Sequence, residues 1–168
     1  MDTVIITADI VCIGFMLITL FGTIVNSKVH KESTRCFILN LVVIIIGTGV
    51  DAYKCYLTVV PHTHFTWLLV SMLSYSFGGV WLIVYSMYLV SVIRTKVKIS
   101  YMTIKPAVII GLADIILVFI GGITGNLIYI ENDVYVIGHW RLIPGLMPLL
   151  CVLYLFGILA KYISKMEL

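Results

Sequence analysis

The chain has 168 residues, of which 61% are hydrophobic and 11% charged, and its mean hydropathy is +1.13. A water-soluble domain carries roughly a quarter charged residues, so this composition excludes an ordinary soluble domain and predicts one domain in a bilayer. The formal net charge of +3 does not indicate nucleic-acid binding, because the basic residues lie between apolar runs and form no single patch.

Five apolar runs are long enough to cross the hydrocarbon core as helices, which takes roughly 20 residues. In chain order they cover about residues 4–26, 36–59, 66–93, 105–129 and 142–163. Helices are favoured over barrel strands because the runs are too long and too continuous for alternating strands. The sequence therefore predicts an all-α membrane protein in which residues 1–168 form a single five-helix bundle.

The first run starts at Val4 with no basic segment before it, so we interpret it as a membrane helix and not as a cleaved signal peptide. The four cysteines lie in or beside apolar runs without CxxC or Cys/His spacing, and we interpret them as small buried apolar side chains. His62 and His64 form an HxH pair that could hold a metal, but two solvated histidines in a short loop is the favoured interpretation. We expect no metal and no cofactor.

The second run carries a polar stripe at helical spacing. Its members are Asn40, Ile44, Gly47, Asp51, Lys54 and Thr58. Steps of three and four residues place them on one face, where Asp51 and Lys54 are close enough to pair. Such a pair either lines a polar cavity or merely lowers the cost of burying two charges.

The fourth run carries a stripe of small residues around one acid. Its members are Ala107, Gly111, Asp114, Val118, Gly121 and Gly125. Small residues at this spacing allow two helix backbones to approach closely, so Asp114 is expected in a packed interface. We assign Asn40, Gly111, Asp114, Gly121 and Gly125 to helix interfaces.

The basic residues predict the orientation, because they gather in cytoplasmic connections. Nine of them share one side: Lys28, Lys31, Arg35, Arg94, Lys96, Lys98, Lys105, Lys161 and Lys165. The opposite side receives Asp2, residues 61–64, Glu131 and Asp133. The N-terminus is therefore expected outside and the C-terminus in the cytoplasm, with a short β-hairpin around residues 131–133 on the outer surface between the fourth and fifth helices.

Several polar side chains are expected near one depth in the outer half, where they would line a ligand-binding cavity for a small polar molecule or a lipid. The assigned residues are Asp9, Asp51, Lys54, Tyr75, His139 and Arg141, with Ser71 and Ser74 beside them. The fifth run is expected to bend at Pro148 and to continue as a helix into the cytoplasm.

The segment "GNLIYIENDVYVIGHWRLIPGLMPLLCVLYLFGILAKYI" resembles the end of the N-terminal membrane region of bacterial GGDEF-type diguanylate cyclases and related histidine kinases. Residues 129–132, Val134 and Tyr135 match the turn of that family, and Gly138 follows it. Val136 stands where a basic residue is usual. The resemblance implies a sensory input domain in the bacterial cytoplasmic membrane, a homodimer, and a cytoplasmic output domain or partner driven through the fifth helix.

We expect no enzyme within these residues, because GxSxG, HExxH, P-loop and DxxD-type motifs are absent from the sequence. In the resembled proteins the cyclase or kinase activity belongs to the output domain. A small-solute transporter or a substrate-binding membrane subunit is the alternative, with Asn40, Asp51 and Asp114 as its polar path. A purely structural subunit would instead tolerate neutralisation of Asp51 and Asp114.

Overall fold

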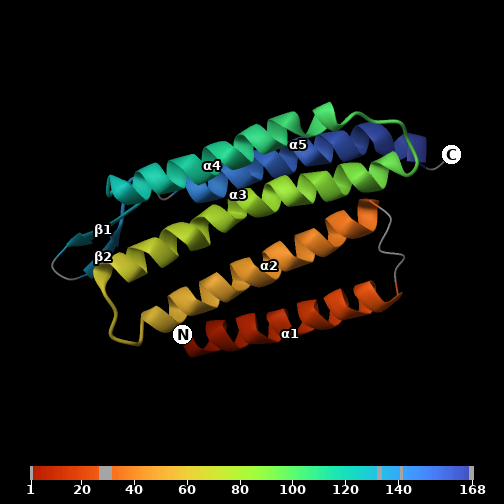
Figure 1. The fold of residues 1–168 in the computed structure, drawn as a ribbon. Helices are drawn as coiled ribbons and strands as arrows, with labels where there is room; N and C mark the ends of the chain where they lie inside the picture. Colours follow the sequence, from red (N-terminus) through yellow and green to blue (C-terminus); the bar gives the residue numbers. More distant parts are fainter. Residues whose placement is uncertain (1, 27–31, 132–133, 141, 167–168) are drawn as a thin grey trace.

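The computed structural model describes residues 2–26, 32–131, 134–140 and 142–166. These residues form five α-helices, whose axes lie side by side and roughly aligned (Figure 1). They are α1 (Asp2–Asn26), α2 (Glu32–Leu57), α3 (His64–Arg94), α4 (Lys105–Ile123) and α5 (Ile143–Met166), with a short 3₁₀ turn, η1 (Tyr101–Ile104), before α4. Each of the five contains a segment long and apolar enough to cross a membrane, as the apolar runs predicted.

The fourth helix is shorter than the sequence predicted. α4 ends at Ile123, whereas the apolar run extends to about residue 129. Gly125 has a φ of 72°, a left-handed conformation that glycine adopts at little cost, and the Leu127 N–H donates to the Gly121 carbonyl oxygen at 2.8 Å. The assignment of Gly125 to a helix interface is therefore wrong, since this residue lies beyond the helix end.

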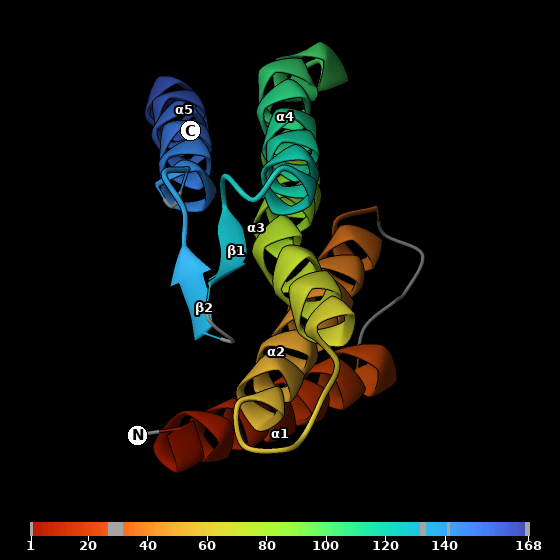
Figure 2. The ribbon, with the colours of Figure 1, turned by 90° about the vertical axis from the view of Figure 1, so that its left-hand side faces the viewer.

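Two short strands follow α4. β1 (Ile128–Glu131) pairs antiparallel with β2 (Val134–Ile137), with Ile128 opposite Ile137 and Glu131 opposite Val134. The strand pair extends from the ends of α4 and α5 along the near end of α3 (Figure 2). The expected turn at residues 132–133 lies outside the described residues.

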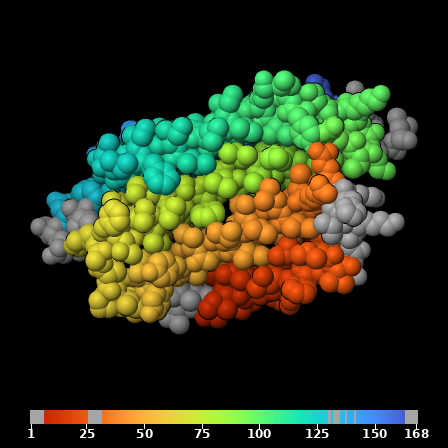
Figure 3. Space-filling model, viewed as in Figure 1, coloured from red at the N-terminus to blue at the C-terminus, as the bar shows by residue number. Residues whose placement is uncertain are grey.

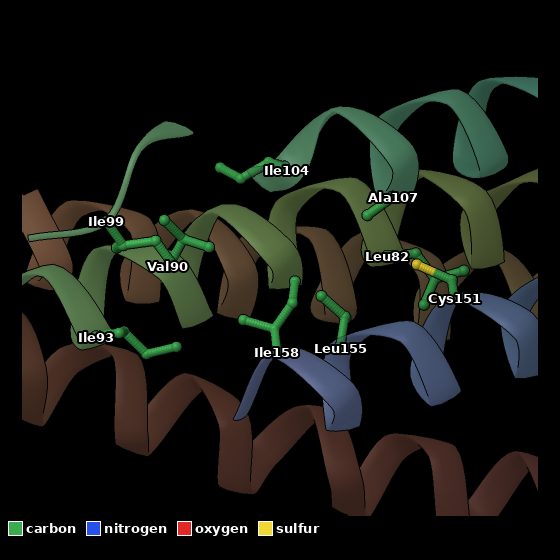
Figure 4. Packing of buried hydrophobic residues seen from close by; sticks show 9 residues of the cluster. All are labelled: Leu82, Val90, Ile93, Ile99, Ile104, Ala107, Cys151, Leu155 and Ile158. Atoms are coloured by element: carbon green, nitrogen blue, oxygen red, sulfur yellow. The ribbon is translucent and has the colours of Figure 1, made fainter. Parts of the chain in front are cut away.

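The central helix of the bundle is α3, which packs against α2, α4 and α5, while α1 packs against α2. In the space-filling view α1 to α4 follow one another across one face of the molecule (Figure 3). A buried apolar cluster joins α3, α4 and α5 near the end of the bundle where α3 ends (Figure 4). Its members are Leu82, Val90, Ile93, Ile99, Ile104, Ala107, Cys151, Leu155 and Ile158.

The helices α2 and α5 lie on different sides of α3 and stand apart in the end-on view (Figure 2). Among the described residues they share at most an incidental contact. One flank of α3 is therefore left without a helix packed along it, and this arrangement positions the site described next.

Candidate functional site

An open cleft of about 570 Å³ lies between α2 and α3 and reaches α5 at Pro144. From α2 it is lined by Val43, Ile44, Gly47, Thr48, Asp51 and Lys54. Each of these positions lies three or four residues from another of the set, so the helical period of α2 directs them to the same face. From α3 it is lined by Ser74, Tyr75, Phe77, Gly78 and Trp81.

The two charged residues of the cleft are held by neighbouring residues of α3. The Ser74 hydroxyl donates a hydrogen bond to the Asp51 carboxylate. The Lys54 ammonium lies 4.1 Å from the centroid of the Tyr75 ring, which is a cation–π distance. The structure therefore ties each charge of the cleft to its own partner on the facing helix.

The pairing of Asp51 with Lys54 that the sequence suggested does not form, because no ion pair joins them among the described residues. Successive residues of a helix point about 100° apart. Ser74 and Tyr75 therefore draw the two charges in different directions, although both remain in one cleft.

Both charges keep bonding capacity. A carboxylate has about four acceptor positions, of which the Ser74 hydroxyl occupies one. The Lys54 ammonium has three N–H donors, and a contact with one ring face leaves at least one of them directed away from the ring. The cleft therefore offers an acceptor and a cationic donor about one helical turn apart on α2.

The remaining residues assigned to the cavity are distributed differently. Tyr75 lines the cleft. Asp9, on α1, is close enough for its carboxyl to interact electrostatically with Asp51, but it does not belong to the described lining. His139 is exposed after β2 and does not belong to that lining either, and Arg141 lies outside the described residues. The cleft thus brings together three of the six: Asp51, Lys54 and Tyr75.

A close approach between α3 and α4 places Asp114. A Cβ atom on Gly79 would lie 2.6 Å from the Gly111 carbonyl oxygen, and one on Gly111 would lie 2.8 Å from the Gly79 carbonyl oxygen. The Asp114 side chain is fully buried beside this contact, and both of its oxygens lack a hydrogen-bond partner among the described residues. An ionised carboxylate is costly in such surroundings, so the packing suits the neutral acid.

Asp114 also lies directly behind one wall of the cleft. Its Oδ2 is 4.0 Å from the position that a Cβ atom would take on Gly78, and Gly78 lines the cleft. Because Gly78 has no side chain, only its backbone separates Asp114 from the cleft at this point.

The two other interface residues have different neighbours. Asn40 is buried on α2, with no partner for its Oδ1 among the described residues. Gly121 faces Leu127 and Trp140, each of which has an atom 3.0 Å from the position of an added Cβ. Gly121 therefore packs against the segment that follows α4 and not against a neighbouring helix.

A cluster around Tyr135 joins β2 to the connection between α2 and α3. The Tyr135 ring stacks on Trp67 with ring centroids 3.6 Å apart, and its hydroxyl lies 2.7 Å from His62 Nε2. His62 Nδ1 lies 2.7 Å from the Val60 carbonyl oxygen, which can only accept. In the neutral imidazole the Nδ1–H therefore donates to Val60, and Nε2 accepts from the Tyr135 hydroxyl.

Burial raises the pKa of Tyr135 above its ordinary value of 10.0, so the phenol keeps its proton and acts as this donor at neutral pH. The interpretation of His62 as a solvated histidine is therefore wrong, since both ring nitrogens are engaged. Sequence reasoning missed the cluster because Tyr135 is 73 residues from His62. His64 is exposed, as expected, but it is the first residue of α3 and not part of the loop.

A third polar cluster, at the opposite end of the bundle, was also missed. Arg94 Nη1 lies 3.6 Å from Glu32 Oε2, the Arg94 guanidinium lies 4.2 Å from the Tyr101 ring centroid, and the Tyr101 hydroxyl donates to Glu32. The only signal in the sequence was a single acid among basic residues. These side chains are well exposed, so the cluster adds little stability.

The described part of the chain contains no group of three or more His, Cys, Asp or Glu residues that could hold a metal ion. The chain matches no known protein family, no curated protein and no solved structure.

Proposed function

We propose that this chain is the membrane-embedded sensory input domain of a bacterial signal-transduction protein, acting as a homodimer in the cytoplasmic membrane. A ligand in the cleft would change the position of α5, which would carry the signal to a cytoplasmic output domain or partner. One observation carries the proposal: the charged face of α2 and Pro144, in the first turn of α5, line the same cleft.

The construction of α5 supports this role. Pro148 has no N–H, so the carbonyl of Pro144 lacks its usual donor one turn earlier, and the helix is weakened where it meets the cleft. Farther along, Cys151, Leu155 and Ile158 are buried, which gives the helix a rigid contact with its neighbours. A ligand can bias the position of α5 only by binding two arrangements with different affinity.

The exposed face of α5 is the proposed dimer seam. Leu146, Leu149 and Leu153 are among its exposed apolar side chains, whereas Leu155 is buried within the subunit. A seam along a two-fold axis would place the same residues of two copies opposite each other. Movement of α5 would then change the geometry of the pair.

Crosslinking between copies tests the coupling of the cleft to α5. Cysteines at Leu146, Leu149 and Leu153, each introduced alone after Cys12, Cys36 and Cys55 are replaced by alanine, are expected to crosslink in native membranes. Leu155→Cys is expected not to crosslink, because this position faces the interior. The yields are measured from dimer bands.

The cleft variants Asp51→Asn and Lys54→Gln should redistribute these yields by about twofold or more, because each removes a charge from the cleft and a change of about 0.4 kcal/mol suffices. Lys105→Gln removes a charge at the start of α4, outside the cleft lining, and is the matched control. A distribution that neither cleft variant alters would show that the cleft and α5 are uncoupled.

Transport of a small solute is the second candidate, and Asp114 favours it. A buried carboxyl that has no hydrogen-bond partner among the described residues, and that a glycine backbone separates from an open cleft, could bind a proton or a cation during transport. Transport requires access to the cleft from both sides of the membrane. A sensor needs access from one side only.

Labelling of single cysteines with an impermeant thiol reagent tests both orientation and access. Thr63→Cys is expected to react in intact cells and Lys96→Cys only after permeabilisation, because these exposed residues flank opposite ends of α3 and the basic connections belong in the cytoplasm. Gly78→Cys, in the cleft wall, is expected to react from the Thr63 side alone. Its reaction from both sides would favour transport, and the reverse pattern at Thr63 and Lys96 would overturn the orientation.

A further inference from the structure

The cleft changes from polar to apolar along α2. From the Leu57 end inward, the face presents Lys54, then Asp51, then Gly47 and Ile44. At 1.5 Å per residue, Asp51 lies about 4.5 Å deeper than Lys54, and Gly47 lies about 6 Å deeper again. A molecule lying along this face meets a cation first, an acceptor second and an apolar surface third.

A second groove adjoins the cleft at Trp81. Trp81 lines the cleft and also lines a groove of about 210 Å³ between α3 and α5, together with Tyr85, Leu89, Leu155 and Phe156. From Ser74 to Leu89 the path follows α3 for about 22 Å. This exceeds half of the roughly 30 Å hydrocarbon core, so the path is long enough for a lipid chain of one leaflet.

We propose that the two adjoining grooves, which share Trp81 as a lining residue, together bind a monoacyl phospholipid. Its phosphate would contact the Lys54 ammonium, its free glycerol hydroxyl would donate to the Asp51 carboxylate, and its single chain would pass Trp81 into the second groove. This inference rests on the proposed function, because it names the class of ligand that would occupy the same cleft.

The order of the charges excludes a zwitterionic lipid, and the need for a hydrogen-bond donor opposite Asp51 excludes a diacyl lipid. In a zwitterionic headgroup the ammonium lies farther from the chain than the phosphate, whereas Asp51 lies deeper than Lys54, so an ammonium would meet the wrong charge. In a diacyl lipid the free hydroxyl is replaced by a second ester, which can only accept and would oppose the carboxylate. A monoacyl lipid provides an anion, a donor and one chain in the required order.

Entry from the bilayer is open to such a molecule. The cleft is open, and α2 and α5 are not packed against each other along their lengths in the described part of the chain. The combined space of the two grooves falls within the range of about 300–1,000 Å³ that is typical for ligand sites.

Titration of the purified chain in a nonionic detergent, followed by native mass spectrometry, tests the inference. Three probes are compared: oleoyl lysophosphatidylglycerol, dioleoyl phosphatidylglycerol and glycerophosphate. The monoacyl lipid is expected to bind at least about tenfold more tightly than either of the others. Equal binding of glycerophosphate would identify a site for a soluble anion, and equal binding of the diacyl lipid would identify a general lipid surface; either result overturns the inference.

Variants assign the two polar contacts. Lys54→Gln is expected to weaken binding of the monoacyl lipid about tenfold, through loss of a charge-assisted contact, while Lys105→Gln leaves it unchanged. Replacing the hydroxyl on the acylated glycerol of the lipid by hydrogen should weaken binding to the native chain but not to Asp51→Leu. If Lys54→Gln and Lys105→Gln changed lipid binding equally, the phosphate contact would be refuted. If loss of the lipid hydroxyl weakened binding equally in the native and Asp51→Leu chains, the contact with Asp51 would be refuted.

The inference and the proposed function fail separately. If the monoacyl lipid binds as described but the cleft variants leave the α5 crosslinks unchanged, the site stands and the sensory role does not. If the cleft variants move the crosslinks and the lipid does not bind, the ligand class is wrong and the coupling remains.

Discussion

Gly79→Ala is expected to destabilise the bundle by about 3 kcal/mol, because the added methyl group meets atoms that cannot move away. Its Cβ would lie 2.6 Å from the Gly111 carbonyl oxygen and 2.9 Å from Ile115 Cγ1. The first of these atoms belongs to the backbone of α4, so relief requires the two helices to separate. Unfolding in a mixed-micelle titration with SDS, followed by circular dichroism, measures the change.

Gly49→Ala is the matched control. Gly49 lies within α2, and an added Cβ would have nothing within 4 Å. Because alanine favours helix over glycine, this variant is expected to be more stable than the native chain by about 0.5 kcal/mol. If the two variants unfolded together, the close approach of α3 and α4 at Gly79 would be disproved.

Trp67→Ala is expected to cost about 2 kcal/mol and to loosen the strand pair. Removing a buried Trp costs about 3–5 kcal/mol, and part of Trp67 is exposed, so a smaller loss follows. The ring of Trp67 stacks on Tyr135 and packs against the buried group of Met72, Val118, Leu127 and Ile128. Hydrogen exchange of the amides of β1 and β2 is expected to accelerate.

Tyr135→Phe separates the ring from the hydroxyl. It keeps the stacking on Trp67 and removes the hydrogen bond to His62, so it is expected to cost only about 1 kcal/mol. The strand amides should remain nearly as protected as in the native chain. If Tyr135→Phe lowered the protection of the strand amides as much as Trp67→Ala does, the hydroxyl and not the stacking would hold the strands in place. That result would contradict the stacking argument.

The contact between Gly79 and Gly111 and the Tyr135 cluster stabilise different parts of the proposed sensor. The contact of Gly79 with Gly111 holds α3 against α4 beside the cleft, and Asp114 lies at the same contact. The Tyr135 cluster holds the strand pair against the start of α3. Changes at the first are therefore expected to alter the cleft wall at Gly78, whereas changes at the second act on the segment between α4 and α5.

The five helices could be predicted from the sequence, because apolar runs of this length must satisfy their own backbone hydrogen bonds in an apolar medium. The sequence also determined which residues of α2 share a face, since the helical period decides this without reference to other helices. Asp51, Lys54 and Gly47 accordingly line one cleft. The small residues of α4 likewise indicated a close helix contact, which the structure forms at Gly111.

Which side chains contact Asp51 and Lys54 depends on the packing of α2 against α3. The helical period places Asp51 and Lys54 on one face of α2 but does not indicate which residues of α3 lie opposite them. In the structure Ser74 contacts Asp51 and Tyr75 contacts Lys54, so the pair that the sequence suggested does not form. A glycine at position 125 is compatible with a helix interface or with the end of a helix, and its positive φ shows that α4 has already ended there. The cleft itself arises because α2 and α5 pack on different sides of α3, and such long-range packing depends on all the facing surfaces at once.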